Sequence, residues 1–328
     1  MTQTLADTKQ PLLQVKDLKQ HFPIKGGVLG RTVNHVKAVD GVSFDIYPGE
    51  TVSIVGESGC GKSTTGRSIL RLDEPTSGDV LFEGKNILNI NKQQMKKVRG
   101  DLQVIFQDPY ASLNPRQTVG QILNESMATL DVVPKKKRPA RIVELLRQVG
   151  LPSDIVNRYP HEFSGGQRQR IGIARALAVE PKLIICDEAV SALDVSVQAQ
   201  VLNLLNNLKK EYDLTYLFIA HDLGVVRHFS DRVIVMYLGR IVEIADKKSL
   251  FANPQHPYTK ALLSAIPVPS RRNKTDRVIL KGDVPSPIDP PSGCSFHTRC
   301  PIATEACKEN IPKFKKVGEN HYVACDLV

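Results

Sequence analysis

Residues 56–64 read Gly56-Glu57-Ser58-Gly59-Cys60-Gly61-Lys62-Ser63-Thr64, which fits the pattern G-x-x-x-x-G-K-[ST] of a phosphate-binding loop, the P-loop. The run at 51–55 before it predicts a buried strand, and the pattern after Lys62 predicts a helix with Ile69, Leu70 and Leu72 available for a buried face. The glycines let successive N–H groups point at phosphate oxygens, and the helix start adds the positive end of its dipole. This arrangement indicates that the chain binds a nucleoside triphosphate.

Individual residues of this loop have distinct expected roles. We expect Lys62 to reach the β- and γ-phosphates and the Ser63 hydroxyl to ligate Mg²⁺. The remaining residues of the loop are expected to line the phosphates: Gly56, Glu57, Ser58, Gly59, Cys60, Gly61 and Thr64. Phe22, which lies just after the first predicted strand, is a candidate ring for stacking on the adenine. The alternative for Phe22 is a core or strand-end aromatic.

Composition limits the class of protein. At 328 residues the length alone suggests two domains, and 41% hydrophobic with 24% charged residues is ordinary for a globular protein. No apolar run approaches 18 residues and no signal peptide opens the chain, so we expect a cytoplasmic protein whose membrane link passes through a partner. The net charge of +10 suits an anionic ligand, an acidic partner or the inner membrane surface. Nucleic acid is not favoured, because no basic-and-aromatic motif occurs and Trp is absent.

A second glycine-rich stretch predicts a second anion site. Residues 163–167 read Phe163-Ser164-Gly165-Gly166-Gln167 and open a predicted helix. Ser164 is placed as an N-cap, and the glycines leave N–H groups bare at the helix start. One nucleotide does not need this second site within its own fold. We therefore expect the stretch to close on the γ-phosphate of a nucleotide held by another chain.

Two carboxylates end a predicted core strand at 182–188. Ligands sit at the strand ends of an open parallel sheet, so we expect Asp187 to hold Mg²⁺ through water and Glu188 to polarise the attacking water. Neighbouring side chains on a strand point to opposite sides and can serve different roles. His221 follows the apolar run 215–220 and is a candidate for the same site, although a lone His is more often structural.

The rest of the chain gives a coarser prediction. Strands are expected at 13–15, 42–46, 79–82, 102–106, 232–236 and 241–244, with a glycine-containing loop between the first two. Residues 115–160 are more helical, with an amphipathic stripe of Val143, Leu145, Leu146 and Val149. The run of cations at 135–138 is expected to be a solvated face.

Residues 267–328 differ in composition from the rest of the chain, with eight of its 21 prolines and four of its six cysteines. The four cysteines are Cys294, Cys300, Cys307 and Cys325, spaced x5, x6 and x17. The C-x2-C pairs of a zinc ribbon are missing, and the segment is too short for its own core. The residues alone leave open an iron–sulfur cluster, zinc, or free thiols.

Together these motifs carry a resemblance. The P-loop, Gln107, the segment Ser164–Gln167, the pair Asp187-Glu188, Asp194 and His221 stand in the order and spacing of an ABC-type ATPase domain, over about residues 12–265. The segment Gln255-His256-Pro257-Tyr258-Thr259-Lys260-Ala261-Leu262-Leu263 resembles one peculiar to the ATPases of oligopeptide and dipeptide importers. Residues 34–40 and 108–115 also resemble that subfamily, and the chain looks like the F-type member of its paired ATPases.

The resemblance implies an α/β fold: a P-loop NTPase core with a mostly parallel sheet, an antiparallel β subdomain, a helical signature subdomain at about 108–175, and a small cysteine-containing C-terminal tail. It implies two parts, an ATP-binding domain at 1–265 and a peptide-importer extension at 266–328. It places Gln107 at the Mg²⁺ and at the coupling to the membrane subunits, puts Asp194 at the nucleotide, and gives His221 a catalytic part beside Glu188. It also implies a [4Fe-4S] cluster on the four cysteines of the extension.

The resemblance therefore implies an ATPase subunit that powers oligopeptide or dipeptide import with ATP and Mg²⁺. The implied partners are a second, related ABC ATPase in a heterodimer, two integral membrane permease subunits and an extracytoplasmic peptide-binding protein, but no nucleic acid. The implied location is the cytoplasmic face of the cell membrane, reached through the permease subunits. The alternative is a soluble ABC-type ATPase that acts as a switch on nucleic acid or ribosomes. Such proteins usually carry two ATPase halves or long coiled-coil insertions, and neither occurs here.

Overall fold

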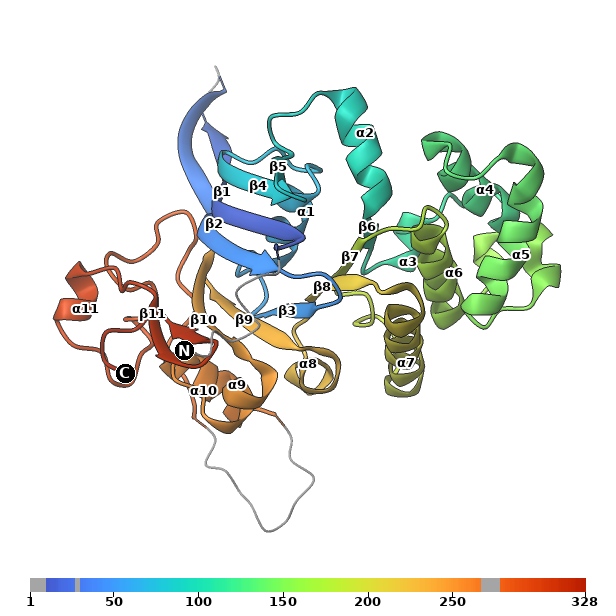
Figure 1. Cartoon of the computed structure of the whole chain (residues 1–328). Helices are drawn as coiled ribbons and strands as arrows, with labels where there is room; N and C mark the ends of the chain where they lie inside the picture. The colour runs from blue at the N-terminus through green and yellow to red at the C-terminus, as the bar shows by residue number, and fades with distance from the viewer. Residues whose placement is uncertain (1–9, 27–29, 267–277) are drawn as a thin grey trace, which may run out of the picture. The chain divides into compact units, whose positions relative to one another are not determined.

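The computed structural model describes residues 10–26, 30–266 and 278–328, drawn as a cartoon in Figure 1. These residues form two compact units, each discontinuous in sequence. The first unit consists of Met1–Ile46, Thr51–Leu88 and Ala220–Val328, and the second of Tyr47–Glu50 and Asn89–Ile219. Within the described ranges, every helix is too short or too polar to cross a membrane.

The first unit contains an antiparallel sheet with the strand order β2-β1-β4-β5. Its strands are β1 (Leu13–Gly26), β2 (Arg31–Ile46), β4 (Ser77–Phe82) and β5 (Lys85–Asn86). The strands expected at 13–15 and 42–46 are confirmed within β1 and β2, where Leu13 pairs with Ile46 and both are fully buried. The loop expected between these strands is wrong: β1 and β2 pair as one long hairpin up to Gly26 and Arg31. Of the glycines that suggested the loop, Gly27 lies outside the described residues.

A second set of strands in the first unit holds the P-loop strand. Its order is β11-β12-β10-β9-β3, formed by β3 (Thr51–Val55), β9 (Arg232–Tyr237), β10 (Arg240–Asp246), β11 (Lys315–Gly318) and β12 (His321–Val323). Strands β3 and β9 run parallel, whereas β9 and β10, which were expected as strands at 232–236 and 241–244, form an antiparallel hairpin. Leu238 and Gly239 turn that hairpin with φ of 45° and 76°, as a type I′ turn requires.

Short helices complete the first unit: α1 (Lys62–Ile69), α8 (Leu223–Phe229), α9 (Lys247–Ala252), α10 (Pro257–Ser264) and α11 (Ala306–Glu309). The helix predicted after the P-loop is confirmed as α1. Its last residue Ile69 and the following Leu70 are buried, but Leu72 is 45% exposed. Leu72 lies outside the predicted face because α1 ends before it.

The second unit combines a parallel sheet with most of the helices. Its strands β6 (Leu102–Ile105), β7 (Leu183–Asp187) and β8 (Thr215–Ile219) follow the order β8-β7-β6. All residues of β8 and the first four of β7 are buried, as is usual for parallel strands covered on both faces. The helices are α2 (Lys92–Asp101), α3 (Pro109–Ser112), α4 (Val119–Leu130), α5 (Arg138–Gln148), α6 (Gly165–Leu177) and α7 (Val195–Tyr212), with 3-10 turns at 135–137, 153–157 and 160–162.

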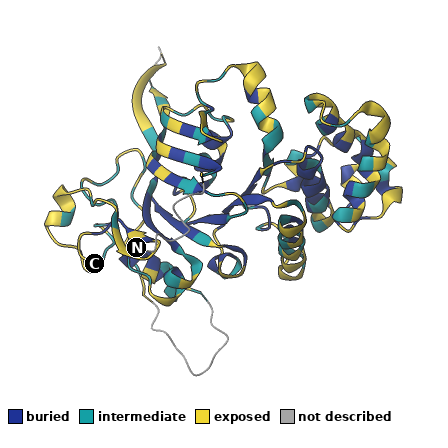
Figure 2. Cartoon of the chain, in the orientation of Figure 1, coloured by how far each residue is buried: buried dark blue, intermediate teal, exposed yellow. Residues whose placement is uncertain are grey.

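Helices α3 to α6 occupy the stretch predicted as a helical subdomain, and Figure 2 shows α4, α5 and α6 with buried and exposed faces. In α5 the predicted stripe is confirmed in part: Leu145 and Leu146 are fully buried, as is Val149 just after the helix. Val143 is 47% exposed, so it lies on the opposite face. Parallel core strands, an antiparallel sheet and a helical segment are the parts that the predicted α/β fold class required.

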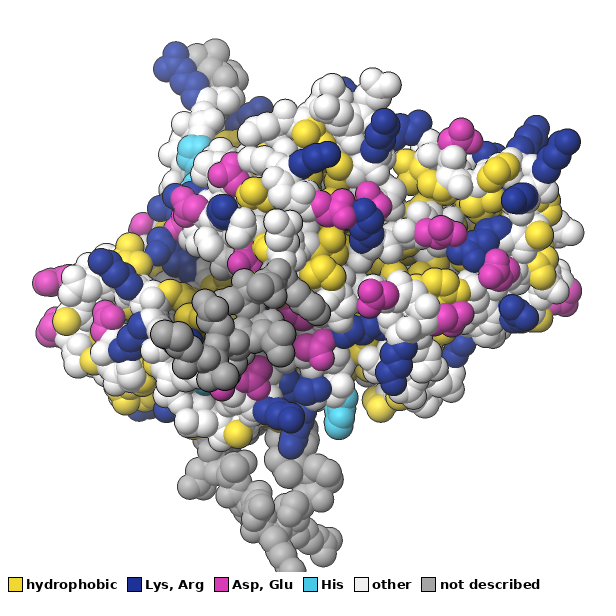
Figure 3. Space-filling view, viewed as in Figure 1, with side chains coloured by type: hydrophobic (Ala, Val, Ile, Leu, Met, Phe, Trp, Pro, Cys, Tyr) yellow, Lys and Arg dark blue, Asp and Glu magenta, His cyan; other side chains and the backbone are white. Residues whose placement is uncertain are grey.

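Charged side chains are mixed on the surface. On the described residues of the face drawn in Figure 3, Lys and Arg side chains are interspersed with Asp and Glu. A protein that follows a nucleic-acid backbone usually gathers its cations in a patch or stripe. No such stripe of cations is seen among the described residues of this face.

The C-terminal extension is built into the first unit. Its strand β12 pairs with β10 through Glu243↔Val323 and Ile244↔Tyr322. Phe296 is 1% exposed and packs edge-on against Tyr237 of β9 at 5.1 Å between ring centroids. The proline-rich extension therefore shares the core of the P-loop unit, which compensates for its lack of a core of its own.

Candidate ATP-binding and hydrolysis site

The P-loop leaves β3 and enters α1 through Gly56 and Gly61, where a side chain would collide with neighbouring backbone. A Cβ on Gly61 would lie 2.1 Å from the carbonyl oxygen of Ala38, and one on Gly56 would lie 2.2 Å from that of Met236. Gly61 also has a φ of 102°, which favours glycine. The backbone can therefore fold tightly enough to present its N–H groups at the N-terminus of α1.

Lys62 is folded back over the loop. Its Nζ donates hydrogen bonds to the carbonyl oxygens of Gly56 and Glu57, both at 2.9 Å, and the residue is only 4% exposed. Both acceptors are neutral carbonyls, so the two bonds that hold the ammonium group include no carboxylate. An anionic phosphate is a stronger partner than a carbonyl, so this arrangement is prepared to exchange carbonyls for phosphate oxygens.

Cys60 lies beneath this lysine, with its Sγ 3.9 Å from Nζ of Lys62. Burial raises the pKa of the Cys60 thiol even though the Lys62 charge acts to lower it. The thiol is therefore neutral near pH 7 and does not neutralise the ammonium. Ser63 and Thr64 follow in the first turn of α1, where both are half-buried.

In the second unit, the structure brings Gln107 and Glu188 together. Nε2 of Gln107 donates to Oε2 of Glu188 at 2.9 Å and to Oγ of Ser191 at 3.3 Å. Glu188 has a φ of 47°, a region that non-glycine residues rarely occupy and that clusters at functional sites. Its backbone N–H donates to the carbonyl of Ile219 at 3.0 Å, which fixes this conformation just after Asp187, the last residue of β7.

The signature segment forms the predicted capped helix start. Ser164 caps α6: its Oγ accepts from the Gln167 N–H at 3.3 Å, and the Gln167 side chain accepts from the Ser164 N–H at 3.0 Å. Ser164, Gly165 and Gln167 are exposed and Gly166 is half-buried. The segment thus presents a helix N-terminus to solvent, where an anion is favoured.

Asp194 is the N-cap of α7 and accepts from the Val197 N–H at 3.0 Å. Its hydrogen bond from Ser196 holds its pKa below the usual value, so it is ionised at neutral pH. His221 is exposed and lies two residues beyond the end of β8. Phe22 lies on β1 opposite Val36 and is 37% exposed. The roles predicted for these three residues stay predictions.

Gly166 allows α6 and α7 to approach closely, and this gives a first test. A Cβ on Gly166 would lie 2.4 Å from Cγ1 of Val197, and a β-branched valine has little freedom to move away. We expect Gly166→Ala to lower the free energy of unfolding by about 1–3 kcal/mol. A Cβ on Gly172 of the same helix would meet no atom of another element within 4 Å, so Gly172→Ala should stabilise by about 0.5–1 kcal/mol. Urea denaturation of both variants measures the difference, and equal midpoints would contradict this packing account.

The four cysteines of the extension are near one another. The Cys294 N–H donates to the carbonyl of Cys307 at 2.8 Å. Burial raises the pKa of the Cys294 thiol, and the charges of the other three cysteines raise it further. In the described ranges, however, no group of three or more His, Cys, Asp or Glu side chains is arranged to hold a metal ion.

Sequence reasoning missed two residues that contact the P-loop, Tyr258 of α10 and Arg299 of the extension. Tyr258 accepts a hydrogen bond from the backbone N–H of Glu57, and Arg299 pairs with the Glu57 carboxylate. It also missed Glu243, a fully buried carboxylate in β10. The only available signal was an acidic residue among the apolar residues at 241–244.

Comparisons with known proteins agree with this geometry. Residues 39–191 match the family model described as ABC transporter, and residues 242–307 match that described as Oligopeptide/dipeptide transporter, C-terminal region. The chain is 55% identical over 325 residues to the Oligopeptide transport ATP-binding protein AppF of Bacillus subtilis (strain 168), which covers 98% of this chain and 99% of that protein. It is 54% identical to a putative peptide import ATP-binding protein of Brucella ovis, over 97% of this chain and 98% of that protein.

A solved structure shows the same fold. The dimeric ATP-binding cassette MJ0796, in a post-hydrolysis state bound to ADP and Pi, is similar with a TM-score of 0.63 and 30% sequence identity. The similarity covers 72% of this chain and 98% of that one. The predicted α/β fold class is therefore confirmed.

Proposed function

Because this chain belongs to the ABC transporter family, among the oligopeptide and dipeptide transport ATP-binding proteins, we propose that its ATP hydrolysis energises peptide import through a membrane complex. The chain is an ATPase. The observation that carries the transport proposal is that residues 242–307 match the peptide-transporter region, whose described residues belong to the unit that holds the P-loop.

The site residues support hydrolysis by positioning and charge neutralisation, as in other P-loop enzymes. Lys62 would leave the carbonyls of Gly56 and Glu57 for the β- and γ-phosphates of ATP. Mg²⁺, held by Ser63 with Gln107 and with Asp187 through water, would neutralise phosphate charge. Glu188 would accept a proton from the attacking water, and its hydrogen bond from Gln107 keeps the carboxylate oriented.

We infer further that the active form is a head-to-tail pair of ATPases. The exposed signature segment offers helix N–H groups to an anion, which would be the γ-phosphate on the partner's P-loop. Asp194 would contact the nucleotide, His221 would take part in catalysis, and Phe22 would stack on the adenine. The partner would be a related but different ATPase, as the F-type resemblance implies, so the isolated chain would turn over slowly.

The membrane partners would dock on the second unit. A hollow there is lined by residues of α2, α4 and α6, with cations such as Lys96 and Arg175 beside apolar residues such as Ile122. Short helices of two permease subunits would fit this surface, and an extracytoplasmic binding protein would deliver the peptide. Arg175, which lines the hollow, donates a hydrogen bond to the carbonyl of Ser112 in α3. Gln107 lies just before α3 and donates to Glu188, so docking at the hollow would be transmitted to Glu188. The chain would then lie at the cytoplasmic face of the membrane.

Purification from membranes tests this function. We expect the chain to co-purify with two integral membrane proteins and a second ATPase. Recovery with nucleic acid or ribosomes, and without membrane subunits, would contradict it.

For the extension we propose a [4Fe-4S] cluster on Cys294, Cys300, Cys307 and Cys325. The soft thiol donors suit iron–sulfur ligation, and the bond from the Cys294 N–H to the Cys307 carbonyl brings two of the four cysteines near each other. A bound cluster would supply folding free energy to a proline-rich segment. We also propose a functional division into an ATP-binding domain at 1–265 and an extension at 266–328. This division concerns function rather than folding, because the extension belongs to the same compact unit as the P-loop.

The cluster has a direct test. Anaerobically purified protein should be brown, absorb broadly near about 400 nm and contain roughly four irons per chain. Cys300→Ser should remove the colour and make residues 278–328 more sensitive to proteases. Cys186→Ser is the matched control, because Cys186 is fully buried in β7 and should leave the iron content unchanged. Stoichiometric zinc without iron in the purified protein would contradict the cluster and indicate a zinc site instead.

A further inference from the structure

An ion pair joins the P-loop to the C-terminal extension. The guanidinium of Arg299 donates from Nη1 to Oε2 of Glu57 at 2.7 Å and from Nη2 to Oε1 at 3.2 Å. The Arg299 side chain is 8% exposed and that of Glu57 29%. Two parallel charge-assisted bonds at a largely buried site fix both distance and orientation. The pair is therefore different in kind from an ion pair in solvent.

A second bond holds the same residue by its backbone. The N–H of Glu57 donates to the hydroxyl of Tyr258 at 2.9 Å, and Tyr258 is fully buried. This N–H is therefore hydrogen-bonded within the protein, to Tyr258. Glu57 is thus held at its main chain by Tyr258 of α10 and at its carboxylate by Arg299 of the extension.

The anchors are themselves held in place by aromatic packing. The Tyr258 ring contacts that of Tyr237 at 4.8 Å and that of Phe296 at 5.4 Å between centroids. Phe296 lies between Cys294 and Arg299 in sequence and is buried. Movement of the segment from Cys294 to Arg299 would therefore disturb both residues that contact Glu57, Tyr258 and Arg299.

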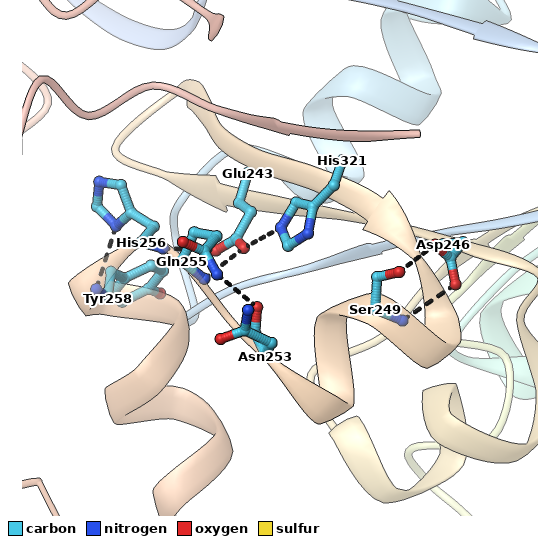
Figure 4. Close-up of polar contacts among 8 residues, drawn as sticks. All are labelled: Glu243, Asp246, Ser249, Asn253, Gln255, His256, Tyr258 and His321. Atoms are coloured by element: carbon cyan, nitrogen blue, oxygen red, sulfur yellow. Dashed lines mark hydrogen bonds and ion pairs between the residues drawn. The ribbon is translucent and has the colours of Figure 1, made fainter. Parts of the chain in front are cut away.

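Buried polar contacts fix the start of α10, as Figure 4 shows. Glu243 accepts from the N–H groups of Gln255 at 2.7 Å and His256 at 2.9 Å, and lies 2.6 Å from Nε2 of His321 on β12. Burial lowers the pKa of His256 to about 3, so its ring is neutral and Nδ1 can accept from the Tyr258 N–H at 3.1 Å. Tyr258 is therefore oriented by contacts from both β10 and the helix start.

From these contacts we propose that Arg299 and Tyr258 are positioning residues for the P-loop: through Glu57 they hold the loop in the form that accepts phosphates. The physical reason is preorganisation. A loop with three glycines at 56, 59 and 61 has many accessible conformations, and fixing one of them in advance lowers the cost of binding. The inference concerns the nucleotide site alone, whatever the complex transports and whatever the cysteines bind.

Such a coupling acts in both directions. If an ordered extension favours nucleotide binding, bound nucleotide must favour the ordered extension by the same factor. A merely structural ion pair would stabilise the extension without changing the nucleotide affinity of the folded chain. The two roles therefore differ in a binding measurement.

The test is a titration of the full chain with fluorescent mant-ATP. We expect Arg299→Gln to weaken binding about 5- to 30-fold, because one partner of a bidentate pair is lost. Arg299→Lys keeps the charge but not the fork and should recover part of the affinity. Lys308→Gln is the matched control: Lys308 forms an exposed i,i+3 pair with Glu305 in the same extension and should leave affinity unchanged.

Two further measurements keep the proposal testable if Arg299→Gln disturbs folding. Glu57→Gln removes the pair from the other side, and the double variant should bind no more weakly than the weaker single variant. Hydrogen exchange in residues 292–310 should slow when mant-ATP binds the native chain, and this effect should vanish in Glu57→Gln. Affinity within twofold of native in both single variants, or exchange that nucleotide does not change, would overturn the proposal.

Discussion

Replacing Glu188 by Gln is expected to lower ATP turnover of the assembled transporter by about 10²- to 10⁴-fold, while ATP binding stays near normal. The reason is that Gln cannot accept a proton but has the same shape and can still accept the hydrogen bond from Gln107. The phosphate contacts at Lys62 are unaffected. The dimer should therefore close on ATP and remain closed.

Phosphate release and size-exclusion chromatography in the presence of Mg²⁺ and ATP measure these two effects. Glu180→Gln is the control, since Glu180 is an acid of the same unit whose side chain is 70% exposed, and its change should leave turnover intact. Near-normal turnover of Glu188→Gln in the complex would show that another group is the base.

Lys62→Ala is expected to weaken ATP binding by about 10- to 100-fold, the equivalent of one lost hydrogen bond between charged groups of about 1.5–3 kcal/mol. The loss falls on affinity rather than on the chemical step, because Lys62 neutralises phosphate charge from the moment of binding. Folding should be little affected, since the bonds that Lys62 makes go to two carbonyls of its own loop.

Titration with mant-ATP measures this affinity, with Lys85→Ala as the control, an exposed lysine on β5 of the same unit. Unchanged affinity in Lys62→Ala would mean that the ammonium keeps its carbonyl partners when nucleotide binds. Together, the two variants separate binding from hydrolysis.

The parts of the site that the sequence predicted are those with local causes. Strand β3, the glycine loop and α1 follow each other within 19 residues, and the Ser164 cap involves only its own helix start. Each element depends on residue type at short spacing, which a single sequence records. The contact of Gln107 with Glu188 was not predicted from spacing, but it follows from two neighbouring parallel strands, β6 and β7, that end at one edge.

The failures share a different cause, namely pairing over long distances. Gly26, Gly27 and Gly30 suggested a loop, but β1 and β2 remain paired up to Gly26 and Arg31. Tertiary pairing overrides local propensity in such strands. In the same way, the sequence could not show that β12 joins β10, or that Arg299 lies against Glu57 across a separation of 242 residues.

The segment 255–259 shows both sides of this difference. The sequence marks it only as a resemblance to peptide-importer ATPases. The structure assigns a physical task to each residue that makes a contact: Gln255 and His256 bond the buried Glu243, and Tyr258 bonds the P-loop. Nothing in the local spacing states these tasks, because both partners lie elsewhere in the chain.

The most direct test of the central claim is peptide uptake by the purified complex in proteoliposomes that contain the extracytoplasmic binding protein. We expect ATP-dependent uptake of peptide when the complex contains the native chain, and loss of uptake when it contains the chain with Glu188→Gln. Uptake that continues unchanged with Glu188→Gln, or that never requires this chain, would contradict the claim that its ATP hydrolysis drives peptide import.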